Sequence, residues 1–548
     1  MITSEIRPYT GVPTLFVNGQ PIPGAAYMTY YTDRNRYADF AEAGYRLFSV
    51  PVCFAARTIN ESSQFPPFKP GIFEGDEPDY TSFDRDMRDL LDACPDALVF
   101  PRVNVSLPIR WEYDHPDECC DTAVGPHKCF CFSSEAWAEE TERLLTAFIE
   151  YTQRSPFAGH IIGYQIACGN TEEWFSFDFK GSVGKRAREA FAASGGTLTA
   201  DGQPSDPAAF NRFLSEVAAG RICRLAGLVK RLTGRRLVVG TFYGYTFECV
   251  GPESCHHAMM TVLESPDVDF ICSPVSYGWG RVAGIDHANM TAVDSIKLHG
   301  KLYFAENDTR THLSRPPCDL PYFQNPIWTG PAPDVTAELI KMHFARALVH
   351  GHAFWWFDMW GGWYACPEYM ALMADVRRIA GESMGRSRAS AARVAVFADE
   401  QVSDTAPADG FSVMYAFRRT LGLCGIPYDV YLAPDYAAVR DKYDVIVLLA
   451  PDVTPALVAI LADHPDALII DGGNAGMTPS ELRRALVDRG AVAYVDTDAV
   501  VYESDGWLFL HTAGDELPAL HVPFGLAEVF GRPLAAGRGK SYLFRKAY

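Results

Sequence analysis

Short apolar runs alternate with stretches of helical periodicity between residues 22 and 380 of the chain. The runs lack the polar alternation of a half-exposed strand, which is typical of strands buried in a parallel sheet. Segments 135–151 and 208–232, by contrast, repeat their apolar residues with the period of an α-helix. Eight strands that alternate with helices in this way predict a closed (β/α)8 TIM barrel. The predicted strands are 23–27, 45–50, 97–103, 161–166, 237–241, 270–274, 302–305 and 353–358.

Two smaller segments follow the predicted barrel. From Arg393 onward, RVAVFADE, YDVIVLLAP and DALIIDGG predict a flavodoxin-like doubly wound α/β domain. No glycine-rich phosphate turn and no exposed nucleophile follows these strands, so we expect this domain to be structural and to form subunit contacts. The segments WLFLHT and SYLFRKAY predict a small C-terminal β domain. The predicted domains are 1–388, with a β-hairpin turn at Asn18-Gly19 that plugs the barrel floor, then 389–499 and 500–548.

The 548 residues carry a formal net charge of −20. Nucleic acids and anionic membranes favour basic surfaces, so neither is an expected partner. The N-terminus lacks a basic start followed by a long apolar stretch, and no apolar run approaches the length that a bilayer requires. A neutral ligand is compatible with this charge, and we expect a cytoplasmic protein.

Two glutamates end predicted strands and are the leading catalytic candidates. Glu173 follows the fourth strand in HIIGYQIACGNTEEW, and Glu306 follows the seventh in GKLYFAENDTRTH. The carboxyl ends of parallel strands are where ligands bind in α/β folds. A single glutamate after a strand is usually a solvated loop residue, but two carboxylates that face one sugar can break a glycosidic bond. We therefore expect Glu173 and Glu306 to be catalytic.

Further polar and aromatic residues follow the same strand ends. Tryptophans near the eighth strand are suited to pack against the apolar face of a sugar ring, although Phe354 and Trp355 are better explained as core packing. The predicted substrate-binding residues are Arg102, Asn104, Asn170, Glu172, Tyr243, Tyr277, Trp279, Trp356, Asp358, Trp360 and Trp363.

Four cysteines gather in one polar loop after the third strand, beside His115 and His127. Zn²⁺ accepts four such soft ligands in a tetrahedron, but the spacing contains no C-x-x-C pair. Structural zinc and free thiols are both compatible with this pattern, and catalysis needs no cofactor. The candidate ligands are Cys119, Cys120, Cys129 and Cys131.

The motifs AEND with Glu306, NTEEW with Glu173 and SPVSYGW with Tyr277 resemble those of glycoside hydrolase clan A. The domain order is similar to that of the family 42 β-galactosidases. The resemblance implies Glu173 as the acid/base, Glu306 as the nucleophile, Tyr277 in contact with that nucleophile, a homotrimer built by the middle domain, and a zinc site near the cysteine loop. The resemblance at the level of residues is confined to the strand ends.

The chain departs from this pattern in two respects. Clan A enzymes usually have Asn directly before the acid/base, where it binds the sugar 2-hydroxyl, whereas Glu172 stands there in this chain. Glu172 is therefore an alternative acid. The two glutamates are separated by 133 residues (306 − 173), which is short for family 42, so a β-mannosidase of a related trimeric family is an alternative to a β-galactosidase. A sugar-binding barrel without catalysis is the alternative from another class. A metal-dependent hydrolase fits less well, because four thiolates would close the zinc shell to water.

Overall fold

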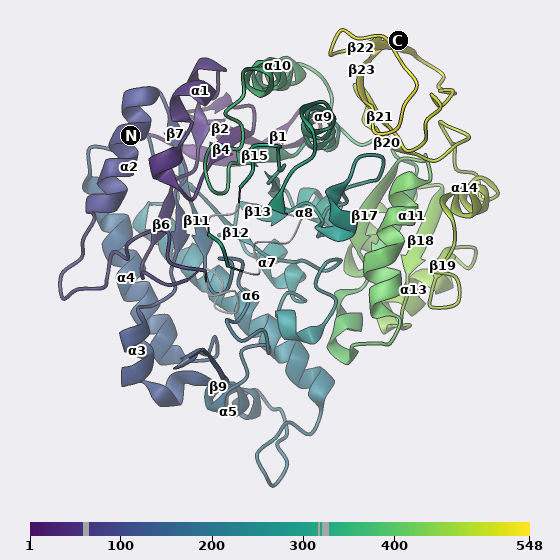
Figure 1. Ribbon diagram of the computed structural model, residues 1–548. Helices are drawn as coiled ribbons and strands as arrows, with labels where there is room; N and C mark the ends of the chain where they lie inside the picture. Colours follow the sequence, from purple (N-terminus) through teal and green to yellow (C-terminus); the bar gives the residue numbers. More distant parts are fainter. Residues whose placement is uncertain (59–64, 126, 316–317, 321–327, 548) are drawn as a thin grey trace.

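The computed structural model describes residues 1–58, 65–125, 127–315, 318–320 and 328–547. A barrel, a parallel α/β sheet and an antiparallel β sheet follow one another along the chain (Figure 1). No helix among these residues is both long and apolar enough to cross a bilayer.

The barrel sheet contains ten parallel strand segments that form eight strands. The second strand consists of β5 and β6 and the third of β7 and β8, because β5 pairs with β7 while β6 pairs with β8. Pro51 and Pro101 stand at these interruptions, and neither has an N–H to donate to the sheet. Pairing of β4 with both β15 and β5 closes the barrel. The segments are β4 (Ala25–Met28), β5 (Leu47–Phe48), β6 (Pro51–Cys53), β7 (Leu98–Val99), β8 (Arg102–Asn104), β11 (Gly163–Ala167), β12 (Val238–Phe242), β13 (Phe270–Pro274), β14 (Leu302–Asn307) and β15 (Ala353–Phe357).

A helix follows each barrel strand, as the alternating pattern predicts, so the (β/α)8 barrel is confirmed. Two of the longer helices begin with a capped N-terminus, since Ser134 accepts from the Trp137 N–H and Asp206 accepts from the Ala209 N–H. The helices are α1 (Tyr37–Glu42), α2 (Thr81–Ala93), α4 (Glu135–Arg154), α6 (Pro207–Leu232), α7 (Met259–Glu264), α8 (Val293–Leu298), α9 (Pro333–His350) and α10 (Pro367–Ser383).

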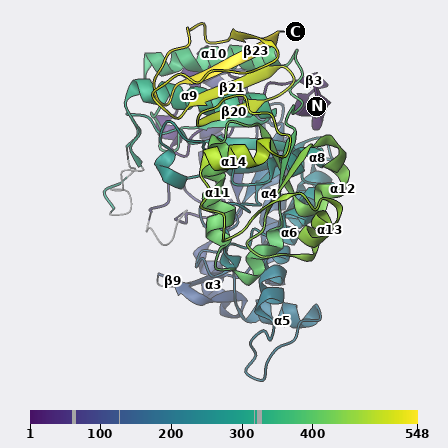
Figure 2. The ribbon, with the colours of Figure 1, turned by 90° about the vertical axis from the view of Figure 1, so that its right-hand side faces the viewer.

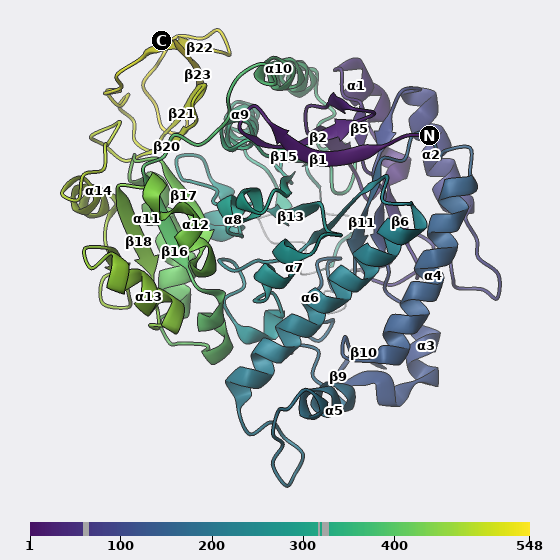
Figure 3. The same cartoon turned by 180° about the vertical axis from the view of Figure 1, so that it is seen from behind.

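The predicted hairpin at Asn18-Gly19 joins β2 (Val12–Val17) to β3 (Gln20–Pro21), and β1 (Ser4–Tyr9) extends it to three strands (Figure 3). The Val238 N–H, at the start of β12, donates to the Ser4 hydroxyl at 2.9 Å. This small sheet therefore covers the amino-terminal end of the barrel, which leaves the opposite end for ligands.

The second part is a parallel sheet in the flavodoxin-like order β17-β16-β18-β19, as predicted. The third is an antiparallel sheet in the order β20-β21-β23-β22, which packs on α9 (Figure 2). Their strands are β16 (Val394–Ala398), β17 (Tyr428–Leu432), β18 (Val445–Leu449), β19 (Leu468–Ile470), β20 (Ala499–Glu503), β21 (Trp507–Thr512), β22 (Gly525–Glu528) and β23 (Ser541–Ala547), and helices α11 (Phe417–Leu423), α13 (Pro455–Asp463) and α14 (Pro479–Val487) accompany the parallel sheet.

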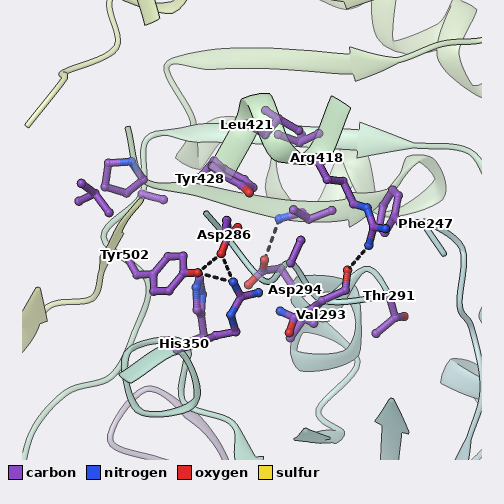
Figure 4. A pocket seen from close by; sticks show the side chains of 18 of the residues that line it. Phe247, Asp286, Thr291, Val293, Asp294, His350, Arg418, Leu421, Tyr428 and Tyr502 are labelled. Carbon is purple, nitrogen blue, oxygen red and sulfur yellow. Dashed lines mark hydrogen bonds and ion pairs between the residues drawn. The ribbon is translucent and has the colours of Figure 1, made fainter. Parts of the chain in front are cut away.

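The three parts meet around a cavity of about 60 Å³ (Figure 4). The Arg346 guanidinium, from α9, donates to Asp286 of the barrel and to the Tyr502 hydroxyl of β20. In the same junction the Val430 N–H of β17 donates to Asp294 of α8 at 2.7 Å. These buried polar contacts join the two smaller parts to the barrel.

Candidate active site

Arg102 lies at the centre of a polar network at the carboxyl ends of the barrel strands. The side chain extends from β8, is 1% exposed, and its Nη2 donates to Glu306 Oε2 on β14 at 2.8 Å. Its Nε donates to Gln165 Oε1 on β11, and its Nη1 donates to the Tyr30 hydroxyl, both at 3.2 Å. Side chains from strands one, three, four and seven therefore meet at one guanidinium.

Aromatic rings surround this guanidinium. Arg102 Cζ lies 4.6 Å from the ring centroid of Phe242 and 5.1 Å from those of Trp355 and Phe357. Ring faces attract a cation, and the apolar surroundings strengthen its interaction with Glu306. Trp355 thus packs in the barrel core, as the sequence indicates, but directly beside the polar network.

Glu173 lies in the loop after β11 and has its own hydrogen-bond partners. The Tyr245 hydroxyl donates to Glu173 Oε1 at 2.6 Å, and His256 Nε2 lies 2.8 Å from the Glu173 carbonyl oxygen. Burial lowers the pKa of His256 to about 3, so the neutral ring donates through Nε2. Burial also raises the pKa of Glu173, although Thr171 and Tyr245 oppose this by hydrogen bonding.

Glu172 belongs to the Arg102 network rather than to that of Glu173. Its carboxylate lies 3.7 Å from Arg102 Nη1 and accepts from Asn104 Nδ2 at 3.3 Å. Burial raises the pKa of Glu172 to about 7, against the opposing charge of Arg102. The two adjacent glutamates therefore have different partners, which separates their chemical roles.

Glu306 is also buried, and its pKa is raised to about 8, chiefly by burial and further by the negative charges of Glu173 and Asp308. The positive charge of the Arg102 guanidinium opposes this shift. One arginine thus lies near the buried Glu172 and Glu306 and the half-buried Glu173, and of these three only Glu306 has a hydrogen-bonded ion pair with it. Such crowding of carboxyl groups with perturbed pKa values is typical of catalytic sites.

The loop that carries Glu172 and Glu173 has an uncommon backbone. Thr171, Glu172 and Trp174 have φ of 55°, 67° and 64°, values that residues other than glycine rarely adopt. The Trp174 N–H donates to the Cys168 carbonyl at 2.8 Å. The Trp174 indole is fully buried and its N–H donates to the Ile166 carbonyl. The loop is therefore tied to the end of β11.

Asn170 begins this loop and is buried. Its N–H donates to the Phe175 carbonyl at 2.8 Å, so its main chain closes the turn that presents the two glutamates. Asn104, Arg102, Glu172 and Asn170 are thus all brought to the same end of the barrel as Glu173 and Glu306.

Tyr243 and Trp356 do not fit the substrate-binding roles that the sequence predicts for them. The Tyr243 hydroxyl donates to the carbonyl oxygens of Ser215 and Cys255, and Trp356 Nε1 donates to the Tyr45 hydroxyl. Successive residues of a strand point to opposite faces. Because the preceding residues of these strands point into the barrel, Tyr243 and Trp356 point outward to the helices.

Tyr277 and Asp358 also have partners other than those expected. The Tyr277 hydroxyl donates to Asp308 Oδ2 at 3.1 Å rather than to Glu306. Asp358 accepts from the Tyr27 hydroxyl at 2.9 Å and from the Trp363 N–H at 2.7 Å. Asp358 therefore fixes the loop after β15, since its oxygens are engaged within the protein.

The tryptophans after β15 are buried against one another. The Trp360 ring centroid lies 4.9 Å from that of Trp328 and 5.5 Å from that of Trp363. Trp279 lies in the short helix Gly278–Arg281, but its side chain is outside the described part of the structure. A sugar-binding role for Trp279, Trp360 and Trp363 stays a prediction.

Several residues of the network were not predicted from the sequence: Tyr30, Gln165, Tyr245, His256 and Asp308. Gln165 is the register partner of Arg102 across β11 and β8, and an inward-facing polar residue in an apolar strand could have indicated it. Tyr245 lies two residues beyond Tyr243 and past the turn at Gly244, where strand alternation no longer indicates the direction of a side chain.

The four cysteines of the predicted zinc site do not converge on one point. Cys119 donates to the His115 carbonyl, Cys120 to the Phe130 carbonyl and Cys131 to the Ser182 carbonyl. Among the described residues, the group whose ligand atoms lie within 4.8 Å of one another is Glu112, His127 and Cys129. The cysteines face different carbonyl groups because they lie on both strands of the β9 (Cys119–Val124) and β10 (His127–Phe130) hairpin and after it.

Arg57 already supplies a cation to this group. Its Nη1 donates to Glu112 Oε1 at 2.7 Å and its Nη2 to Cys129 Sγ at 3.4 Å, and the Arg57 and Glu112 side chains are 3% and 0% exposed. A zinc ion would have to displace this buried guanidinium, so the donor set does not fit a zinc site as it stands.

No protein-family model and no curated protein matches the sequence. Solved structures match in fold. The β-galactosidase from the psychrophilic Marinomonas ef1 is 14% identical with a TM-score of 0.62, over 95% of this chain and 100% of that one. The β-galactosidase from Bacillus circulans sp. alkalophilus is 11% identical with a TM-score of 0.61, over 95% and 98%. An exo-carrageenase of GH42 from Bacteroides ovatus is 11% identical with a TM-score of 0.59, over 99% and 84%.

These likenesses extend over nearly the whole chain and confirm the fold that the sequence predicts. The protein shares the fold of these solved structures, and the polar network of its barrel lies at the carboxyl ends of the strands.

Proposed function

We propose that this protein is a retaining, exo-acting β-glycosidase, most simply a β-galactosidase. The observation that carries the proposal is the pair Glu173 and Glu306 at the ends of strands four and seven, one held by Tyr245 and the other by Arg102. The fold shared with β-galactosidases supports it.

In the proposed reaction, Glu306 attacks the anomeric carbon of the terminal sugar while Glu173 protonates the departing glycosidic oxygen. The bond to the leaving group breaks as the bond to Glu306 forms. Glu173 then takes a proton from water, and the resulting hydroxide displaces Glu306 and releases the sugar with its configuration retained. The two carboxyl groups are expected to lie about 5 Å apart.

Arg102 and Tyr245 have distinct parts in this scheme. Burial raises the pKa of Glu306 to about 8, and the Arg102 guanidinium opposes this shift by stabilising the ionised form, which is the form that attacks. Burial also raises the pKa of Glu173, which favours the protonated acid, and the Tyr245 hydroxyl orients its carboxyl group. Asn104 and Glu172 are the proposed contacts to the sugar hydroxyl groups.

The second candidate is a β-mannosidase. The position directly before the acid is occupied by Glu172, a buried carboxyl whose partners are Asn104 and Arg102. A carboxylate accepts two hydroxyl hydrogen bonds where an amide offers one donor and one acceptor, so the preferred stereochemistry of the sugar 2-hydroxyl differs.

The test is hydrolysis of aryl β-galactoside, mannoside, glucoside, glucuronide and fucoside by the wild type, Glu306→Ala, Glu173→Ala and Glu172→Gln. Release of one sugar that either alanine variant abolishes supports the proposal. Azide should restore turnover to Glu173→Ala, because a small anion can resolve the glycosyl-enzyme without a general base. If the wild type releases no sugar from any of these substrates, the result favours a sugar-binding barrel without catalysis.

We also propose a cytoplasmic homotrimer with contacts through residues 389–499. Phe411, Val453 and Val492 of this part are 60%, 60% and 62% exposed, which is unusual for large apolar side chains on a monomer surface. All 14 cysteines are free thiols, as is usual in a reducing compartment.

A further inference from the structure

Arg310 is a buried arginine with unused hydrogen-bond donors. It stands four residues after Glu306 and is 8% exposed, yet its Nε and Nη2 have no hydrogen-bond partner. Its guanidinium carbon lies 4.6 Å from the ring centroid of Trp328 and 5.5 Å from that of Tyr277. The aromatic faces stabilise the cation, but they cannot accept its N–H groups in the plane of the guanidinium.

The charges around Arg310 do not balance. Arg281 forms a hydrogen-bonded ion pair with Asp308, and Arg310 Nη2 lies 3.4 Å from the other oxygen of the same carboxylate without a hydrogen bond. His343 packs nearby and burial lowers its pKa well below the usual value, so it adds no compensating or opposing charge at neutral pH. Two buried guanidinium groups therefore share one carboxylate, and burial of an uncompensated cation is costly.

Arg310 lines a small cavity together with Tyr277, Arg281, Thr309 and His343. The cavity measures about 40 Å³. At roughly 10–15 Å³ for each water-sized volume, it has room for about three such volumes, comparable to the oxygen atoms of a carboxylate or a sulfate group. An oxyanion there would accept from the unused N–H groups and neutralise the excess charge.

The cavity borders the candidate active site. Tyr277, in its wall, donates to Asp308, which stands two residues after Glu306. The charge of Asp308 acts on the carboxyl groups of both Glu173 and Glu306. A ligand that occupies the cavity is therefore within electrostatic reach of both proposed catalytic groups.

We propose that this cavity, with Arg310 in its wall, binds an oxyanion carried by the substrate, so that the enzyme prefers a β-glycoside with a carboxylate or a sulfate group. The inference rests on the proposed glycosidase function and adds the class of its substrate. The net charge of −20 disfavours a long polyanion through repulsion, so the substrate is a short glycoside whose single anionic group Arg310 positions.

The test compares the wild type with Arg310→Gln, Arg310→Lys and, as a matched control, Arg315→Gln, since Arg315 is exposed and donates to nearby carbonyl groups. The substrates are aryl β-galactoside, aryl β-galacturonide, aryl β-glucuronide and aryl β-galactoside 6-sulfate. We expect the wild type to prefer an anionic substrate, and Arg310→Gln to lower the ratio of kcat/KM for that substrate to kcat/KM for galactoside by about 10- to 100-fold, the value of a charged hydrogen bond. Arg310→Lys should lose less, and Arg315→Gln should leave all rates unchanged.

A binding measurement separates this inference from the proposed function. Calorimetric titration of Glu306→Gln with galacturonate, galactose 6-sulfate and galactose needs no turnover, and comparison of the first two ligands identifies the oxyanion.

Tighter binding of an anionic sugar than of galactose, lost when Arg310→Gln is added to this variant, supports the inference. Hydrolysis of galactoside with no anionic preference and no effect of Arg310→Gln overturns the inference and leaves the glycosidase intact. Absence of both turnover and anionic-sugar binding overturns both proposals. If Arg310→Gln fails to fold, the test uses the affinities of Glu306→Gln alone. Tighter binding of an anionic sugar than of galactose supports the inference, and equal or weaker binding overturns it.

Discussion

Among the residues that the structure describes, Arg102 supplies the one guanidinium that is hydrogen-bonded to a proposed catalytic carboxylate. Its three donors reach Glu306, Gln165 and Tyr30 from a position that is surrounded by aromatic rings. In such surroundings a charge interaction is stronger than in water, and the charge of Arg102 is the main influence that opposes the rise of the Glu306 pKa on burial. The chemical state of Glu306 depends on this residue.

Arg102→Met is expected to change the acid limb of the pH profile. Loss of the positive charge removes the interaction that lowers the pKa of Glu306, so that pKa rises and the ionised fraction falls at any given pH. The acid limb of kcat/KM should therefore move to higher pH, with an activity loss of at least 100-fold near neutrality. A pH–rate profile on the preferred aryl glycoside measures this, and an unmoved acid limb contradicts the assignment.

Tyr245→Phe and Tyr243→Phe form a matched pair. The Tyr245 hydroxyl bonds the Glu173 carboxyl and lowers its pKa, whereas the Tyr243 hydroxyl bonds two main-chain carbonyls behind the barrel wall. Tyr245→Phe should raise the pKa of Glu173 and move the basic limb of kcat/KM to higher pH. Tyr243→Phe should cost about 1 kcal/mol of unfolding free energy and leave the pH profile unchanged. Equal pH profiles of kcat/KM for the two variants would contradict the proposed contact of Tyr245 with the catalytic acid.

The location of Glu173 and Glu306 at the carboxyl ends of barrel strands could be predicted from the sequence, because a carboxylate at the end of an apolar run is visible without structure. The direction of Tyr245 could not, since β12 ends at Phe242 and the chain turns at Gly244, whose φ is 79°. The alternation of inward and outward side chains holds within a strand and is lost at its end. The unused donors of Arg310 depend on which groups surround it in space, and sequence does not contain that information.

At the scale of elements, the loop 169–175 carries Glu172 and Glu173, and its residues Thr171, Glu172 and Trp174 have strained backbone conformations. Residues with positive φ other than glycine cost free energy, and the surrounding hydrogen bonds must offset it. Gly169 makes the loop feasible, because it has a φ of 73° and a Cβ at this position would lie 2.1 Å from the Phe175 carbonyl oxygen.

Gly169→Ala should therefore disrupt the site. The clash forces the loop away from Phe175 and displaces Glu173, so we expect a loss of at least 100-fold in kcat/KM and a destabilisation of roughly 2–4 kcal/mol, from positive φ and overpacking together. Gly195→Ala is the control, since Gly195 also has positive φ, at 101°, but nothing lies within 4 Å of its Cβ. Activity should survive there. Thermal unfolding measures the stability of both variants, and steady-state kinetics measure their kcat/KM.

The second prediction at the scale of elements concerns metal binding at the hairpin of β9 and β10. Arg57 occupies the space between Glu112 and Cys129, so metal chelators should leave the melting temperature and activity unchanged. Arg57→Met leaves the Glu112 carboxylate buried without its cation, which should cost about 3–5 kcal/mol. Urea unfolding measures the cost, and elemental analysis for zinc measures the metal content. One equivalent of tightly held zinc in the wild type would refute this interpretation.

At the scale of the whole molecule, the alternation of apolar runs and helical segments was sufficient to predict the barrel and the flavodoxin-like sheet. Each predicted barrel strand overlaps an observed one. The interruptions in strands two and three were not predicted, because local proline effects decide them. The cavity among the three parts also could not be predicted, since Asp286, Arg346 and Tyr502 are far apart in the chain and meet only after packing.

The assembly prediction concerns the exposed apolar residues of the parallel sheet domain. Light scattering after size exclusion should give a mass three times the chain mass of 60.6 kDa. Val492→Asp and Phe411→Asp should reduce that mass, because they place a charge in the proposed interface. Tyr113→Asp is the control, since Tyr113 is 62% exposed on the barrel. A monomeric wild type would contradict the trimer without affecting the catalytic proposal.

Closure of the barrel requires a strand that is translated late in synthesis of the chain. Strand β4 pairs Ala25 with Phe354 of β15, so more than 300 residues must be translated before the first barrel strand meets its last neighbour. At about 5–20 residues per second, the apolar edge of β4 waits on the order of 20 to 60 seconds on the ribosome. During that interval it is an exposed sheet edge of the kind that chaperones shield, and yield in a heterologous host should depend on chaperone supply more strongly than on the stability of the finished protein.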